Sequence, residues 1–265
     1  VYNRLGEQAM DLGGRRVHFG SGSDLLFAQE PGQSSRHRAV MDDVRRAARL
    51  ADALPNIDFA MTMATPSEAP PDHAYLLSMR ALMESTIKPV VCTADNRADL
   101  EAIWDVAAIL RGGEEVLRRE PYVIHYAEPV SPLKHPFTSL DKLLVCAEKG
   151  MPAIYSPAPI AGSTAPMTMA GHIVQGLAEC LTGLVIHQLH VEGAPLPMGM
   201  GPAVLDMATA ACPYNAPAYY RSYVGILQLC HPYTLPAWGS ACPRDANPPA
   251  LHAPLEPGPL TRPAQ

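Results

Sequence analysis

The sequence lacks the signals that mark several large classes of protein. Charged residues make up only 17% of its 265 residues and the formal net charge is -6, so we expect no basic surface for nucleic acid. No continuous run approaches the roughly 18 apolar residues of a membrane-spanning helix, and the first residues contain no apolar core of signal-peptide length. We therefore expect a cytoplasmic protein without a nucleic-acid or membrane partner.

The cysteines lack the spacing of disulfide frameworks and of metal sites. The sequence has 6 cysteines, widely spaced and without a CxxC pair. Most fall in apolar segments, where a free cysteine acts as a small hydrophobic residue, so we expect them to be reduced and structural. No group of His, Cys and carboxylate residues has metal-ligand spacing, and we predict no bound metal.

A glycine fingerprint for nucleotides is also missing. Residues 20–24 read GSGSD, which has neither GxGxxG spacing nor the lysine of a phosphate-binding loop. A Schiff-base aldolase would need a lysine at the end of a strand, whereas Lys88 begins a strand and Lys134 and Lys142 fall in a loop and on a helix. Both enzyme classes are therefore disfavoured.

The chain does contain a regular alternation of strand-like and helix-like segments. We count about seven short apolar strands and six helices, the pattern of repeated βα units on a parallel sheet. The clearest helix follows Asn96, a good N-cap, because Leu100, Ile103 and Trp104 recur at helical spacing. An open sheet fits the count too, but short apolar strands without a nucleotide fingerprint favour an α/β fold of the TIM (β/α)8 type, incomplete at its C-terminus.

The domain boundary is expected near residue 240. Residues 1–240 carry the barrel pattern, whereas residues 241–265 contain 7 prolines and show neither a helical nor a strand period. Such a segment cannot bury enough surface to fold, so we predict a disordered tail. A barrel without its last unit has unpaired edge strands, which favours association into a homo-oligomer.

Two strand-to-loop junctions are the most informative features. Residues 122–129 read YVIHYAEP, and residues 151–167 read MPAIYSPAPIAGSTAPM. Each is a buried strand that runs into a polar, Pro/Gly-rich turn, and the active sites of barrels lie where strands meet such turns. We therefore expect both loops to face one mouth. His125 alternates with Tyr126 and should face the helix layer instead.

These segments resemble the trimethylamine methyltransferase family. The resemblance is carried by YAEPVSPLKHPFTSLDKLLVCAEKGMPAIYSPAPIAGSTAPMTMAG, with NIDFAMTM, KPVVCTA and LPAWGSA around it. It covers residue 1 to about residue 240, in loops as well as strands. The resemblance implies a TIM barrel that moves a methyl group from trimethylamine or a betaine such as glycine betaine to the cobalt of a corrinoid. The corrinoid is held on a separate small protein, the expected partner.

The resemblance also suggests roles for loop residues. Aromatic faces and carboxylates hold a quaternary ammonium, so we predict Glu128 and Tyr126 as catalytic residues, with a turn-capping carboxylate as the alternative for Glu128. For substrate binding we predict Asp95, Tyr155 and Asp206. Asp95 doubles as a candidate helix cap, and Asp206 lies in a glycine-rich turn that it could merely close.

The loop after Tyr155 contains only small residues. This suggests the close approach of something large and flat, and a corrinoid ring would qualify. The predicted corrinoid contacts are Ser156, Ala158, Gly162 and Ser163. The alternative is a tight loop whose prolines and glycine set the backbone angles.

The C-terminal part departs from the family pattern. The best-known trimethylamine members carry pyrrolysine, which we place just after Trp238-Gly239-Ser240-Ala241, and no non-standard residue is present here. The chain is therefore more similar to members that act on betaine-type quaternary amines. Its tail replaces the next expected loop and helix and reads like a frameshifted or truncated end. The alternative function is a truncated, non-catalytic homologue that binds a small cation or a partner.

Overall fold

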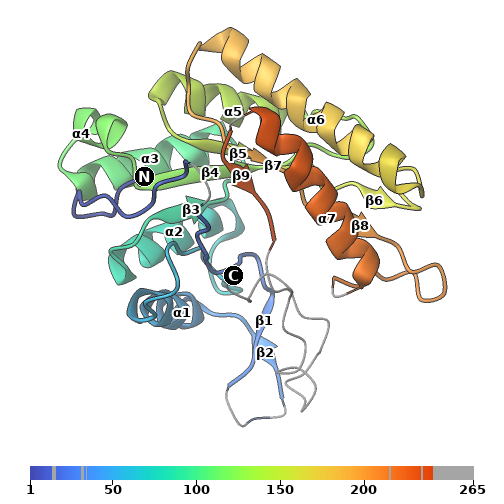
Figure 1. Ribbon diagram of the computed structural model, residues 1–265. Helices are drawn as coiled ribbons and strands as arrows, with labels where there is room; N and C mark the ends of the chain where they lie inside the picture. The colour runs from blue at the N-terminus through green and yellow to red at the C-terminus, as the bar shows by residue number, and fades with distance from the viewer. Residues whose placement is uncertain (14–15, 31–32, 34, 215, 234, 241–265) are drawn as a thin grey trace. The chain divides into compact units, whose positions relative to one another are not determined.

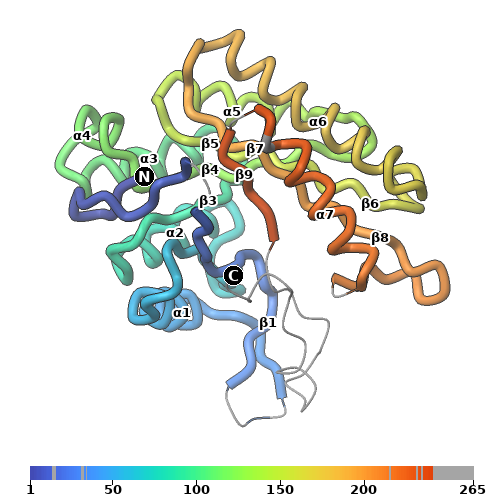
Figure 2. Tube along the Cα trace, in the orientation of Figure 1, coloured from blue at the N-terminus to red at the C-terminus, as the bar shows by residue number. Residues whose placement is uncertain are grey.

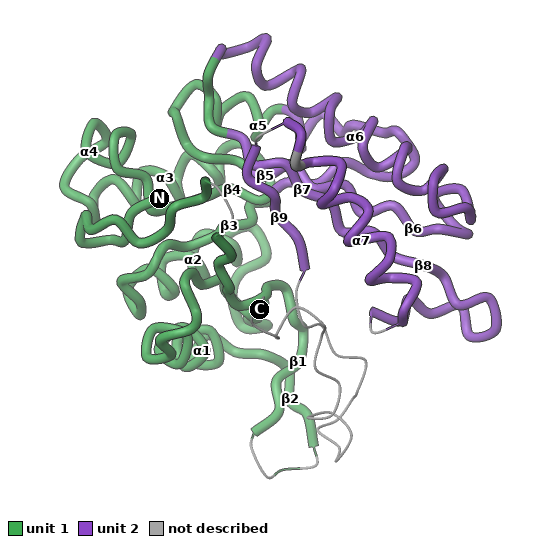
Figure 3. Tube along the Cα trace, viewed as in Figure 1, with its two compact units in different colours: residues 1–126, 141–153, 193–195 green, residues 127–140, 154–192, 196–265 purple. Residues whose placement is uncertain are grey.

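The computed structural model describes residues 1–240 except 14–15, 31–32, 34, 215 and 234. The chain divides into two compact units, shown in different colours in Figure 3. Unit 1 consists of residues 1–126, 141–153 and 193–195, and unit 2 of residues 127–140, 154–192 and 196 onward. The tail that we predict to be disordered, residues 241–265, lies outside the described residues.

Unit 1 is built on parallel strands (Figure 1). β3 (Val90–Cys92) pairs in parallel with β4 (Val123–Ala127), and Cys92 lies opposite His125. On the other side of β3, parallel bridges join Ala60 to Val90 and Gly20 to Phe59. Every residue of β3 is buried, as expected for a strand covered on both faces. These four segments thus lie side by side in chain order.

Helices connect the strands of unit 1, and α3 forms for the predicted reasons. The Oδ1 atom of Asn96 accepts a hydrogen bond from the Asp99 backbone N–H at 3.1 Å, and Gly112 ends the helix with a φ of 94°. The predicted stripe at Leu100, Ile103 and Trp104 is buried. The remaining elements are β1 (Phe27–Ala28), β2 (His37–Arg38), α1 (Met41–Ala53), η1 (Pro71–His73), α2 (Ala74–Ser85), α3 (Arg97–Arg111), α4 (Glu114–Arg119) and most of α5 (Phe137–Lys149).

Unit 2 also has parallel strands. Tyr155 of β5 lies opposite Met198 of β7, and Met198 lies opposite Ala237 of β9. The short strands β6 and β8 form a second parallel pair. The elements are the end of β5 (Ala153–Tyr155), β6 (Ile160–Ala161), α6 (Met169–His190), β7 (Met198–Gly199), β8 (Ala203–Val204), α7 (Pro217–Cys230), η2 (His231–Tyr233) and β9 (Ala237–Trp238).

The core of unit 2 lies around α6 and α7, which run side by side (Figures 1 and 2). Ile173 and Cys180 of α6 pack with Ile226 of α7 and with Met198. By length and composition alone, α6 is long and apolar enough to cross a membrane. It nevertheless buries His172, Glu179 and His187 inside unit 2, as the core helix of a folded domain can do.

The fold is therefore α/β with mostly parallel strands, as predicted at that level. The prediction of a TIM barrel is not confirmed. Over the residues described for it, neither unit closes its strands into a barrel.

The cysteines match the prediction as far as they are described. Cys92, Cys146, Cys180, Cys212 and Cys230 are free, and all but Cys212 are buried. Burial raises the pKa of the Cys180 thiol to about 11, so it stays protonated and unreactive near neutral pH. Cys242 lies outside the described residues.

Candidate functional site

The end of β4 places two predicted site residues beside each other in the chain. Tyr126 is partly exposed, Glu128 is exposed, and His125 is fully buried. His125 thus lies in the packed interior, and the prediction that it faces the helix layer stays a prediction. Glu128 belongs to unit 2 and Tyr126 is the last residue of this segment of unit 1. Their catalytic roles remain predictions.

The loop after β4 is a small closed turn in unit 2. The backbone of Val130 exchanges hydrogen bonds with that of Lys134, at 2.8 and 3.0 Å. The carboxylate of Glu179, on α6, accepts hydrogen bonds from the Ser131 hydroxyl at 2.7 Å and from the Leu133 N–H at 2.9 Å. Glu179 has no exposed surface. A buried carboxylate therefore ties this loop to the helix that covers it.

Tyr155 lies at the end of β5 and is also fully buried. Its hydroxyl and Nδ1 of His135 are 2.9 Å apart, and the two rings are within 17° of parallel. Burial raises the pKa of Tyr155, and Glu179 and Cys180 raise it further. The phenol is therefore neutral near pH 7. Because the ring is enclosed, its effect on a ligand would pass through His135, which is partly exposed.

The small-residue loop after β5 is tightly braced. The Ile160 N–H donates to the Thr164 hydroxyl at 2.9 Å, and the Thr164 carbonyl accepts from Gln175 at 2.8 Å. Gly162 has a φ of 86°, which side chains rarely tolerate. These features agree with the alternative of a tight loop. Of the predicted corrinoid contacts, Ser156 is buried, Gly162 is partly exposed, and Ala158 and Ser163 are exposed.

Asp206, in the turn after β8, closes its own turn. Its carboxylate accepts hydrogen bonds from the Thr209 hydroxyl at 2.6 Å and the Ala208 N–H at 3.1 Å. The Thr209 hydroxyl and the Ala208 N–H lower the pKa of Asp206. This geometry corresponds to the turn-closing alternative, and a role in substrate binding remains a prediction.

In unit 1, the end of β3 carries Asp95. Asp95 is exposed, and its neighbour Asn96 provides the cap of α3. The buried ammonium of Lys142, on α5, donates hydrogen bonds to the carbonyl groups of Ala94 and of Asp95, the latter at 3.3 Å. Burial lowers the pKa of Lys142. Lys142 therefore braces the turn that presents Asp95.

His125 should make the stability of the protein depend on pH. Its side chain is fully buried, and its Nδ1 atom lies 3.9 Å from the Cys92 Sγ. Burial, with a smaller contribution from Lys142, lowers the pKa of His125 from 6.5 to about 3. Between these values the unfolded chain takes up a proton that the folded chain does not. Stability is therefore fully present above pH 6.5 and falls as the pH drops, by roughly 2 kcal/mol between pH 7 and pH 5.

Urea denaturation at pH 7 and pH 5 tests this expectation. In His125→Leu the drop in stability between the two pH values should be smaller by that amount, while the exposed control His73→Gln should behave like the wild type. Buried His187, whose pKa burial lowers to about 4, should contribute a similar drop that both variants retain. An unchanged drop in His125→Leu would contradict the assignment.

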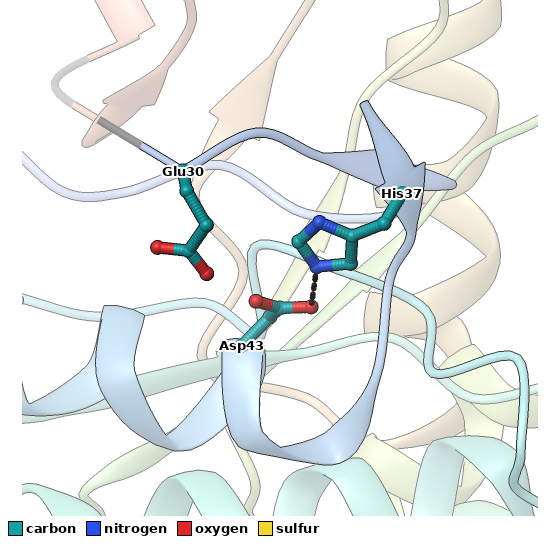
Figure 4. Close-up of side chains that lie close together, drawn as sticks. All are labelled: Glu30, His37 and Asp43. Carbon is teal, nitrogen blue, oxygen red and sulfur yellow. Dashed lines mark hydrogen bonds and ion pairs between the residues drawn. The ribbon is translucent and has the colours of Figure 1, made fainter. Parts of the chain in front are cut away.

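One cluster has the composition of a metal site. Glu30, His37 and Asp43 lie together at the start of unit 1 (Figure 4), with His37 Nε2 at 3.1 Å from Asp43 Oδ2. The Arg46 guanidinium, however, donates to Glu30 at 2.7 Å and to Asp43 at 2.5 Å. Asp43 also accepts from the Val40 N–H, at the start of α1. The carboxylates are therefore already neutralised, and no metal is inferred here.

A hollow in unit 1 contains none of the predicted site residues in its lining. It is lined by Asp52, Asp58 and Lys88, near the amino ends of the strands. Each of these groups is paired: Asp52 accepts from Thr86, Asp58 accepts from the Phe19 N–H, and the Lys88 ammonium donates to two carbonyl groups. Each of these three charged side chains therefore already has a partner within unit 1.

A comparison with known families decides the ancestry. The family model described as trimethylamine methyltransferase (MTTB) matches residues 2–256. The chain belongs to the trimethylamine methyltransferase family. The match extends past residue 240, where the sequence resemblance was expected to end.

Relatives within the family are similar at modest identity. The chain is 26% identical over 230 residues to trimethylamine methyltransferase MttB of Desulfitobacterium hafniense strain DSM 10664, covering 86% of this chain and 46% of that protein. It is 27% identical over 238 residues to a glycine betaine methyltransferase of Desulfitobacterium hafniense strain Y51, covering 89% and 50%. The chain thus spans about half the length of the curated relatives it matches.

A solved structure shows a weaker likeness. Streptococcus suis SuiB bound to S-adenosylmethionine matches with a TM-score of 0.40 and 7% identity, over 76% of this chain and 41% of that one. A likeness of this size carries no argument about fold or function.

Sequence reasoning missed three residues that lie in these loops or hydrogen-bond to them. His135, Glu179 and Lys142 were not predicted as site residues, because they lie in a loop or on helices rather than at strand ends. The only local signal for His135 is its place within the run YAEPVSPLKHP, which carries the family resemblance. Glu179 offered the general signal of a carboxylate in an apolar helix, where an ionised group must find partners.

Proposed function

We propose that this chain takes part in methyl transfer from a methylated amine, more specifically a quaternary amine such as glycine betaine, to the cobalt of a corrinoid on a separate protein. Family membership over residues 2–256 is the observation that carries the proposal. The two relatives named above support the class of donor. We also propose that the βα units belong to a TIM-type barrel, and that the protein is a cytoplasmic homo-oligomer.

The proposed reaction is a displacement at carbon. A Co(I) corrinoid held by the partner protein near the loop of Ser156, Ala158, Gly162 and Ser163 would supply the electron pair for the new bond to the methyl carbon. The bond between that carbon and nitrogen breaks, and nitrogen keeps its electron pair, so glycine betaine would leave as dimethylglycine. No proton is transferred for a quaternary substrate. The protein therefore has to orient the cation rather than provide an acid or base.

Glu128 and Tyr126 are suited to hold such a cation. A carboxylate attracts the quaternary ammonium, and an aromatic face binds it through its quadrupole. Glu128 is exposed and Tyr126 partly exposed at the carboxyl end of β4, the end at which barrel enzymes bind substrates. Exposed Ala158 and Ser163 would leave space for a flat ring.

The expected result of Glu128→Gln is a methyl-transfer rate about tenfold or more below that of the wild type. The amide keeps the shape of the side chain but loses the charge that attracts the cation. The assay follows the spectrum of the methylated corrinoid, with glycine betaine, a corrinoid protein and a reductant. Exposed Glu192, also in unit 2, provides the control Glu192→Gln, which should keep the full rate.

A panel of methylated amines decides between the two function classes. If no member of the panel yields a methylated corrinoid with the wild-type chain, methyl transfer by this chain is refuted. The non-catalytic homologue that binds a small cation or a partner would then be supported. Equal rates for Glu128→Gln and Glu192→Gln would show that Glu128 does not contribute to the reaction, although the chain still catalyses it.

A further inference from the structure

His135 is held in one place by two buried residues of unit 2. It follows directly on the closed turn from Val130 to Lys134, which Glu179 ties to α6. Its Nδ1 atom is 2.9 Å from the hydroxyl of Tyr155. Glu179 and Tyr155 have no exposed surface, whereas His135 is partly exposed. Of these three residues, His135 is therefore the one that a ligand can reach.

The direction of the hydrogen bond follows from the burial of Tyr155. A buried hydroxyl hydrogen without an acceptor is costly, and His135 Nδ1 is the acceptor that the described residues provide. If Nδ1–H donated instead, the phenol hydrogen would be left without a partner. Tyr155 therefore donates, Nδ1 accepts, and the neutral imidazole carries its proton on Nε2.

The Nε2–H group of His135 is thus a donor without a partner of its own. Among the described residues, His135 has no second hydrogen bond. An N–H donor at a partly exposed position suits a carboxylate, because hydrogen bonds to charged acceptors are the strong ones. It does not suit a methylammonium group, which offers no acceptor.

We propose that His135 Nε2–H binds the carboxylate of a betaine-type substrate, and that Tyr155 and Glu179 are positioning residues that fix its ring and its tautomer. This inference rests on the proposed function and narrows the substrate to a zwitterion. Glu128, seven residues earlier on the same loop segment of unit 2, would face the opposite charge of that zwitterion. The two side chains together would favour a betaine over an amine without a carboxylate.

The first test compares two ligands that share the quaternary ammonium. Binding of glycine betaine and of tetramethylammonium is measured by calorimetry for the wild type, His135→Leu and the control Lys134→Met. Lys134 is exposed and adjacent, so it reports any general attraction of the carboxylate to positive charge. We expect His135→Leu to weaken betaine binding about tenfold or more, with tetramethylammonium binding within about twofold of the wild type.

Three results of this test would overturn the inference. Betaine binding could survive in His135→Leu, both ligands could weaken equally, or Lys134→Met could lose betaine binding to the same extent. If the wild type transfers methyl groups from betaine but shows any of these results, the inference fails and the proposed function stands. A wild type that neither binds nor demethylates betaine overturns both.

The second test reads the tautomer directly. Long-range ¹H–¹⁵N spectra of the imidazole, assigned with His135→Leu, should show an unprotonated Nδ1 and a protonated Nε2 in the wild type. Tyr155→Phe should shift this pattern toward the mixture of tautomers seen in free imidazole and should lower the preference for betaine. The control Tyr214→Phe, at an exposed tyrosine of the same unit, should leave both unchanged. A wild-type ring protonated on Nδ1 would contradict the proposed donor.

Discussion

Replacing Glu179 with alanine is expected to lower the free energy of unfolding by about 3 kcal/mol. The carboxylate has no exposed surface and accepts hydrogen bonds from Ser131, Leu133 and Gln175, at 2.7 to 3.0 Å. Alanine would leave a cavity and would remove the acceptor for a backbone N–H. The loss should appear as a lower midpoint in urea denaturation followed by circular dichroism.

The conservative variant Glu179→Gln distinguishes the contribution of the hydrogen bonds from that of side-chain packing. Glu179→Gln keeps an oxygen for the Leu133 N–H but places an NH₂ group where the Ser131 hydroxyl needs an acceptor. We therefore expect the free energy of unfolding to fall by about 1 kcal/mol. The exposed control Glu192→Ala should stay within about 0.5 kcal/mol of the wild type. If Glu179→Ala lowers the free energy of unfolding by no more than Glu192→Ala does, the network does not stabilise unit 2.

Gly183→Leu should lower the free energy of unfolding by about 3 kcal/mol or more. A Cβ atom at Gly183 would lie 2.1 Å from Cδ1 of Tyr155, whose ring is fully buried. Leucine is normally the better helix former by nearly 1 kcal/mol, so a loss here measures the clash rather than helix propensity. The measurement is again urea denaturation. Gly201→Ala, where a Cβ would meet only ordinary contact at 3.9 Å, is the control and should change little.

A double-mutant cycle identifies the cause of that loss. In a Tyr155→Leu background the flat ring is absent, so Gly183→Leu should cost distinctly less than it does in the wild type. Equal costs in the two backgrounds would mean that the ring is not what excludes a side chain at this position. The same cycle reports on His135, because displacement of Tyr155 removes its hydrogen-bond partner.

Local signals predicted the regular elements well. The cap at Asn96 and the stripe at Leu100, Ile103 and Trp104 predicted α3, and the structure confirms both. The apolar strands predicted parallel pairing, which β3 and β4 show. These features depend on residues near one another in the chain, so their spacing carries the information.

The sequence did not predict the contacts between residues that are far apart in the chain. The role of Tyr155 in substrate binding stays a prediction, but its burial against Gly183 and its contact with the partly exposed His135 were not predicted. Glu179 meets Ser131 across 48 residues of sequence. Nothing in local spacing specifies such a pair, since it depends on how a helix packs over a loop.

The sequence by itself determined the family and the alternation of strands and helices. These follow from local patterns and from a resemblance spread along the chain. Only the tertiary structure decided which loop residue faces outward and which is buried behind it. Burial and hydrogen-bond direction are properties of packed neighbours, and for this reason His135 emerges as the candidate contact and Tyr155 as its support.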